Sequence, residues 1–260
     1  MNLNIFKTFF IIFALSFSAA TGQAQKRGSP SVAPAKPSMG SPVKFRFLAN
    51  YDFVMTSPSD LNNQRAQFLW NSATATQGTF NNMNGFAIGG GYFLNQGFLG
   101  VEYSHVLQDL SNTLISPGTY SVKDSFNYDT VYVLYDWVFN KGANQSYELG
   151  LGVGQAIKFQ YHNIITTGNV TEDLFWQSTP IVFKARAHYS YHFSDNVRLR
   201  LGATFENATS SSMKADSNHP TITVNGTGIV SGQTLKNTSG SDTKVDISGF
   251  RLNAGLVVAF

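Results

Sequence analysis

Hydrophobic and polar residues alternate strictly in the segment VKFRFLANYDFV, which spans residues 43–54. Val43, Phe45 and Phe47 begin one face of this segment, whereas Lys44 and Arg46 begin the other. A period of two residues is typical of a β-strand that has one apolar and one polar side. The segment is therefore predicted to be a strand between an apolar and a polar environment.

The same division recurs along the chain. YELGLGVGQAIKFQYH, IVFKARAHYSYHF and VRLRLGATFE carry aliphatic and aromatic residues on one face and glycines or charged residues on the other. Weaker alternation is found at residues 85–94, 98–108, 126–139 and 245–260. In YVLYDWVF we place Val131, Val133, Tyr135 and Trp137 on the apolar face, because this turns Asp136 to the polar one. Together the segments predict about eight strands.

The connections between these strands alternate in length. Short ones are expected at residues 95–96, 140–145 and 194–196, and long polar ones at residues 55–83, 109–125, 163–178 and 208–244. An even number of strands with short turns at one end and long loops at the other is typical of an outer-membrane β-barrel. The predicted fold class is all-β, a transmembrane antiparallel up-and-down barrel of about eight strands.

A secreted β-sandwich also shows alternation, and the placement of charge separates the two folds. Within the predicted membrane-spanning parts, no Lys, Arg, Asp or Glu falls on an apolar face, a strictness that a sandwich does not need. Gly150, Gly152 and Gly154 fall on the charged face, where a narrow lumen needs small residues beside long ones. Aromatic residues gather at the strand ends and predict two girdles. They are Phe53, Tyr103 and Tyr161 near the loops and Trp137, Tyr147, Tyr191 and Phe193 near the turns.

The N-terminal region divides into two parts before the barrel. Residues 1–24 resemble a secretory signal peptide with cleavage after Ala24, and the Pro, Ser and Ala-rich residues 25–42 are expected to be a flexible periplasmic linker. Residues 43–260 form the predicted barrel, and we expect it in the bacterial outer membrane. The chain has no cysteine, which excludes a disulfide scaffold and a thiolate metal site. The formal net charge is +3 without a dense basic run, so nucleic acid is not expected as a partner.

The C-terminal strand and two internal segments resemble a known family. A polar residue, a glycine, a hydrophobic residue and a terminal aromatic residue resemble the C-terminal signal of bacterial outer-membrane proteins, and they stand at Asn253, Gly255, Val258 and Phe260. The resemblance implies recognition by the barrel-assembly machinery. YELGLGVGQ and YHFSDNVRLRLGATFE look like strands of small OmpA-like and OmpX-like barrels. The chain departs from OmpA-like proteins because no peptidoglycan-binding domain follows the barrel.

The polar faces would place many charges inside the barrel, and these are our candidate site residues. The bases are Lys44, Arg46, Lys158, Lys184, Arg186, Arg198, Arg200 and Arg251, facing Asp52, Glu102, Asp136, Glu148 and Glu206. Enclosed charges need partners or water. We expect one ion-pair layer among those at similar heights, in which Arg198 and Arg200 face the acids; its members are Arg46, Glu102, Asp136, Glu148, Arg198 and Arg200. It would act as a plug or gate or simply fill the lumen, and its basic surplus leaves a narrow anion-preferring path open.

A lipid A deacylase is the enzymatic alternative, because His188 and Ser190 resemble its His-x-Ser element and Glu206 could be a third member. Both His188 and Ser190 face the lumen in this register, away from lipid, and His188 and His192 are too far apart to share a metal. We therefore expect no catalytic residue, no cofactor and no metal site.

The long loops are expected to carry any specific function. LNNQRAQFLW, within residues 55–83, is compatible with a short helical turn, and Asn225-Gly226 predicts a type I′ hairpin. The function that we expect is structural or surface-interacting, of adhesion type, with a narrow channel as the alternative. Expected partners are outer-membrane lipid and lipopolysaccharide, the barrel-assembly machinery and a surface ligand.

Overall fold

The structure is a computed structural model. It describes residues 45–56, 80–94, 97–116, 118–140, 144–208, 212–224, 227–236, 241–244 and 247–260. The expected signal peptide, the linker and the segment LNNQRAQFLW lie outside these ranges, and so does Lys44. Among the described residues, no helix has the length and apolar character needed to cross a membrane.

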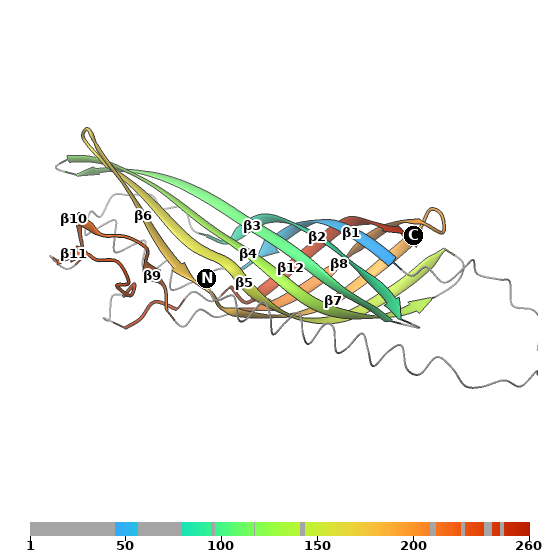
Figure 1. Cartoon of the computed structure of the whole chain (residues 1–260). Coiled ribbons are helices and arrows are strands. Elements are labelled where there is room, and N and C mark those ends of the chain that lie inside the picture. Colours follow the sequence, from blue (N-terminus) through green and yellow to red (C-terminus); the bar gives the residue numbers. More distant parts are fainter. Residues whose placement is uncertain are drawn as a thin grey trace, which may run out of the picture. The chain divides into compact units, whose positions relative to one another are not determined.

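Eight antiparallel strands close into a barrel (Figure 1). In ring order they are β1 (Phe45–Met55), β2 (Asn82–Leu94), β3 (Gly97–Ser116), β4 (Gly118–Asn140), β5 (Gln145–Thr167), β7 (Ile181–His192), β8 (Val197–Asn207) and β12 (Gly249–Ala259). The ring is closed by β1 and β12, which pair from Arg46 with Ala259 to Met55 with Phe250. The predicted eight-stranded up-and-down barrel is confirmed.

The strands are staggered around the ring. From Phe45, successive paired residues lead once around the barrel and return to β1 at Met55, ten residues further along, through Tyr92, Leu99, Tyr135, Leu151, Ala185, Phe205 and Phe250. A closed eight-stranded sheet with such a stagger has strands tilted by roughly 35–45° and an interior just wide enough for side chains.

The two faces of the barrel have opposite polarity to those of a water-soluble protein. Leu151 and Leu252 are more than half exposed on the outer face, whereas Glu102 and Arg200 are almost completely buried inside. The residues that we placed outward on β4, including Val133 and Trp137, do lie outward. Large apolar residues outside and charges inside suit a barrel surrounded by lipid, so the fold is that of a transmembrane β-barrel.

Two of the predicted loops are extended hairpins instead. Residues 109–125 form the end of β3 and the beginning of β4. Residues 163–178 form the end of β5 together with β6 (Val170–Ser178). The second hairpin turns at Gly168-Asn169, where Gly168 has a φ of 59°. Beyond the membrane no lipid demands apolar residues on the outside, so the hydrogen-bonded ladder continues without the alternation that marks it in the sequence.

β6 and β7 behave as one strand that is interrupted at Pro180. The upper part of β5 pairs with β6 and its lower part with β7. Pro180 has no N–H to donate to the sheet, but its carbonyl still accepts the backbone N–H of Ala156 at 3.0 Å. The wall on this side of the barrel is thereby continuous along β5.

A β-bulge in β5 corrects the predicted phase of this strand. Asp129 pairs with Lys158 and Thr130 with Ala156, which leaves Ile157 as an extra residue. One extra residue turns every later side chain to the opposite face. Phe159 and Tyr161, which were predicted to face lipid, are therefore buried inside. Lys158, which was predicted to face the lumen, is exposed on the outer face.

The chain between β8 and β12 contains three short strands, β9 (Lys214–Ala215), β10 (His219–Val224) and β11 (Thr227–Ile229). β9 adds to the edge of β6, with Ala215 opposite Trp176. β10 and β11 pair as a hairpin in which Val224 faces Thr227, as predicted, although they form a separate sheet and Asn225-Gly226 lies outside the described residues.

The long connections define a loop side of the barrel and the short ones a turn side. On the loop side, buried apolar residues from the strands and from the segment after β8 pack together. We call this cluster the apolar plug, and it comprises Val54, Phe80, Met83, Val106, Phe126, Tyr128, Phe159, Tyr161, Leu174, Trp176, Met213, Ala215, Leu235 and Ile247. It closes the loop-side half of the interior, and no pattern in the sequence predicted it.

Candidate functional site

The turn-side half of the interior holds a continuous series of ion pairs in which acids and bases alternate. Seven of the eight barrel strands contribute to it; β2 instead lines the interior with Gly85, Ala87, Gly89 and Gly91. We call this series the charge chain, and in order of contact it comprises Arg46, Glu148, Arg200, Asp136, Arg186, Glu102, Lys184, Glu206, Arg251 and Asp52.

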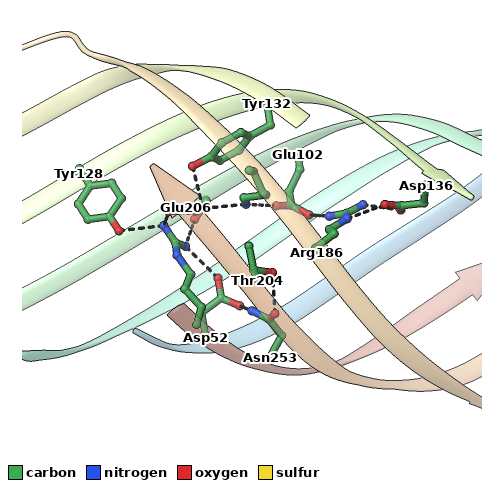
Figure 2. A network of polar contacts seen from close by, with 12 residues as sticks. Asp52, Glu102, Tyr128, Tyr132, Asp136, Arg186, Thr204, Glu206 and Asn253 are labelled. Atoms are coloured by element: carbon green, nitrogen blue, oxygen red, sulfur yellow. Dashed lines mark hydrogen bonds and ion pairs between the residues drawn. The ribbon is translucent and has the colours of Figure 1, made fainter. Parts of the chain in front are cut away.

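Arg251 lies at the loop-side end of the charge chain, opposite Val54 of β1. Figure 2 shows three of its partners, Asp52, Glu206 and Tyr128. Its guanidinium group pairs with Asp52 at 3.1 Å and also with Glu206. It donates further hydrogen bonds of 2.8 Å to the hydroxyl groups of Ser104 and Tyr128. Asp52 in turn accepts a hydrogen bond of 2.6 Å from Asn253. Arg251 is thus held by four partners on four different strands.

Lys184 and Arg186 form the middle of the charge chain on β7. The Lys184 ammonium lies 2.7 Å from Glu102 and 3.1 Å from Glu206, and 3.7 Å from the centre of the Tyr132 ring. Arg186 binds Asp136 through two hydrogen bonds of 2.7 and 2.5 Å and reaches Glu102 at 2.6 Å. Such two-pronged guanidinium–carboxylate contacts are the strong form of ion pair.

The turn-side end of the charge chain is looser. Arg200 lies 3.0 Å from Glu148 and 3.5 Å from Asp136, and Arg46 lies 3.2 Å from Glu148. The Arg46 guanidinium group also stands over the Phe93 ring at 4.6 Å. Arg198, one pleat nearer the turns than Arg200, is buried but has no ion pair with any residue that the structure describes.

The candidate residues therefore fall into three groups. Those of the charge chain are brought together, but along the barrel and not in one layer. Arg198 lies beside them without an ion pair, and Lys158 lies on the outer face because of the bulge in β5. The alternation of apolar and polar residues predicted that the first group faces the lumen. Nothing in the sequence predicted the bulge that turns Lys158 outward.

Glycine on the inner face makes room for these crossing side chains. A Cβ atom added to Gly150 would lie 1.8 Å from Oδ1 of Asp136, which is bound to Arg186. At Gly152, on the same face two residues later, the nearest atom would be Cβ of Leu134 at 3.1 Å. Gly150 is thus a position where the charge chain itself excludes a side chain.

Gly150→Ala is expected to lower the free energy of unfolding by about 1–3 kcal/mol, as overpacking of an interior does. Gly152→Ala is the control, and it should cost less than about 1 kcal/mol because a small shift of Leu134 accommodates the methyl group. Urea titration of the refolded barrel measures both values. Equal losses at the two positions would contradict the proposed role of Asp136 in excluding a side chain.

The residues of the deacylase alternative are not assembled into a triad. Within the described ranges no hydrogen bond joins His188 to Ser190 or Glu206, and the Ser190 hydroxyl donates to Glu148 at 3.5 Å. Glu206 is bound by Lys184, Arg251 and Tyr132. Within the described ranges, no group of His, Cys, Asp and Glu side chains has the arrangement of a metal site.

The four residues of the predicted assembly signal lie on both faces of β12. Asn253 points inward and bonds Asp52 and Thr204, and a Cβ atom on Gly255 would lie 2.2 Å from the Ala49 carbonyl oxygen. Val258 and Phe260 point outward, and the Phe260 N–H donates to the Phe45 carbonyl at 3.0 Å. Their role in recognition stays a prediction.

The closed ring, the stagger and the polarity of its faces define a small transmembrane β-barrel of the architecture found in outer-membrane proteins. No family model matches the chain, and no curated protein matches its sequence.

Solved structures give three comparisons. Neisserial surface protein A is 14% identical with a TM-score of 0.39, covering 83% of this chain and 97% of its own. Ail, the attachment invasion locus protein of Yersinia pestis, solved with the heparin analogue sucrose octasulfate, is 11% identical with a TM-score of 0.33, covering 84% and 98%. The outer membrane protease OmpT of Escherichia coli is 8% identical with a TM-score of 0.26, covering 85% and 98%. Similarity at this level says nothing of ligand or activity.

Proposed function

We propose that the protein is an integral outer-membrane barrel that is closed to solutes and presents extended hairpins at the cell surface for adhesion-type interactions. The filled interior is the observation that carries this proposal. Glu102, Arg186 and Arg251 are buried in the charge chain, and the apolar plug lies above them. A lumen occupied in both halves leaves the surface hairpins as the parts available for a partner.

The projecting parts of the barrel support the surface role. β4 and β5 have 23 residues each, whereas about 9–11 tilted residues suffice to cross a bilayer. β3, β4, β5 and β6 continue together beyond the other strands in Figure 1. Among the described residues, the pairing of β3 with β2 ends at Leu107, and no other described strand pairs with this side of β3 up to Ser116. An unpaired strand edge of this kind suits the addition of a partner strand.

Export and assembly belong to the same proposal. Residues 1–24 would direct export and be removed after Ala24, and residues 25–42 would remain as a periplasmic linker. The assembly machinery would recognise the last strand through Phe260 and its spaced partners. Outer-membrane lipid and lipopolysaccharide would surround the apolar outer face.

Adhesion of whole cells tests the surface role. Cells displaying the full chain should bind laminin-coated or heparin-coated surfaces several-fold better than cells without it. Replacing residues 110–122 with a short Asn-Gly turn should remove most of the gain. Replacing residues 219–229 in the same way is the control for loop trimming at a different hairpin. A barrel that assembles normally but gives no gain on either coating would contradict the adhesion role.

A narrow anion-preferring conduit is the second candidate, and the cationic surplus at the turn side favours it. Planar-bilayer recording of the refolded protein separates the two functions. The closed barrel should give no stable current steps in potassium chloride. Reproducible steps with a reversal potential on the chloride side would replace the closed barrel with the conduit.

A further inference from the structure

Three guanidinium groups gather inside the barrel near its turn side. Arg46 on β1 and Arg198 and Arg200 on β8 are 5%, 8% and 1% exposed. In the backbone register of β7 and β8, Arg198 lies opposite His192 and Arg200 lies opposite Ser190, at the turn-side ends of both strands. We call Arg46, Arg198 and Arg200 the arginine cluster.

The arginine cluster carries more positive charge than its neighbours compensate. The charge chain alternates five acids with five bases, and Arg198 is an additional cation beside it. Glu148 is shared by Arg46 and Arg200, and Asp136 is already bound by Arg186. At this end three arginines therefore share Glu148 and Asp136, and the next carboxylate is that of Asp195 in the exposed turn before β8.

Several donors of the arginine cluster have no acceptor among the residues that the structure describes. They are the Nε atoms of Arg46 and Arg198 and the Nε, Nη1 and Nη2 atoms of Arg200. Nη2 of Arg200 is within ion-pair distance of Glu148 and Asp136, but not in hydrogen-bond geometry. Buried donors without acceptors are rare in native proteins, and those of a charged group are the most costly to leave unpaired.

We infer that the arginine cluster binds a small oxyanion of the phosphate class. Guanidinium groups present paired N–H donors that match the oxygens of phosphate. The three side chains project into the lumen, so an anion in the lipid headgroup layer would have to cross the barrel wall to reach them. A free anion would therefore have to enter from the turn side, where Arg198 is the most exposed of the three and His192 is half-buried.

Phosphorus NMR tests this inference with the refolded full chain in octyl glucoside, a detergent without phosphorus. The phosphorus resonance of inorganic phosphate at millimolar concentration should broaden when the protein is present. The midpoint of thermal unfolding of the protein should rise with phosphate concentration at constant ionic strength, because a ligand that binds the folded state stabilises it. Sodium chloride at the same ionic strength should give a smaller rise.

Arg198→Gln should weaken phosphate binding at least tenfold without unfolding the barrel, because Arg198 takes part in no ion pair with a described residue. Arg198→Lys should fall between this variant and the wild type, since it keeps the charge but loses the paired donors. Lys214→Gln, which removes an exposed cation of β9, is the control and should bind as the wild type does.

Three outcomes would overturn the inference. Either the wild type leaves the phosphate line sharp and its unfolding midpoint unchanged, or Arg198→Gln binds phosphate as strongly as the wild type. Competition by added lipid A would place the anion on the outer face and so contradict a site in the lumen. None of these results depends on whether the surface hairpins mediate adhesion.

Discussion

Arg251→Met is expected to lower the free energy of unfolding of the barrel by about 3–5 kcal/mol, the usual cost of removing one partner from a buried ion pair. Asp52 and Glu206 would both remain enclosed without their common cation. The hydroxyl groups of Ser104 and Tyr128 would also lose their donor. Methionine keeps much of the side-chain volume, so the loss reports charge and hydrogen bonding more than packing.

Lys214→Met is the control for Arg251→Met, because it removes an exposed cation on the loop side and should change the unfolding free energy by less than about 0.5 kcal/mol. Both values come from urea titration in lipid bilayers. The double variant Arg251→Met with Asp52→Asn should recover part of the loss, since Asp52 has no other ion pair among the described residues, whereas Glu206 keeps Lys184. A loss below about 1 kcal/mol for Arg251→Met would mean that water replaces the guanidinium group.

Leu201→Arg should destabilise the barrel by about 2–4 kcal/mol, the range for arginine facing lipid near the bilayer midplane. Leu201 is 44% exposed on the outer face of β8, midway along this strand, and pairs with Ala254 on one side and Tyr189 on the other. The cost arises from placing a charged side chain in hydrocarbon.

The matched control is Thr171→Arg on the exposed face of β6, within the hairpin that projects beyond the membrane. There the new guanidinium group would meet water, and we expect a change below about 0.5 kcal/mol. Titration of both variants in the same bilayer separates the position from the residue type. If Leu201→Arg were as mild as Thr171→Arg, the apolar band would not include β8.

The membrane-spanning part of the fold could be predicted because lipid imposes a simple rule on it. Outward residues must be apolar there, so Asp136 alone settled the phase of β4, and the same rule placed Arg186 and Glu102 in the lumen. Which acid binds which base could not be derived, because those contacts depend on the stagger of ten residues and on the reach of long side chains.

The loop-side half could not be predicted because the rule reverses above the membrane. There the outside meets water and the inside holds the apolar plug, so apolar side chains such as Phe126 and Phe159 belong inside. The sequence around the bulge, IKFQY, fits either phase, since Lys158 is its only charged residue. The dipeptide Gly168-Asn169 could have predicted the turn between β5 and β6, because it is a hairpin dipeptide like Asn225-Gly226.

The pair between Asp52 and Arg251 joins the first and the last strands of the ring. These two residues are 199 positions apart in the chain, and they meet only when β1 and β12 come together. An insertion intermediate with an open seam would expose both charges to the lipid side of the gap. Arg251 can keep Glu206 on the neighbouring strand β8, whereas Asp52 gains its cation only when the sheet closes. We therefore expect a barrel with an open seam to be disfavoured within the hydrocarbon.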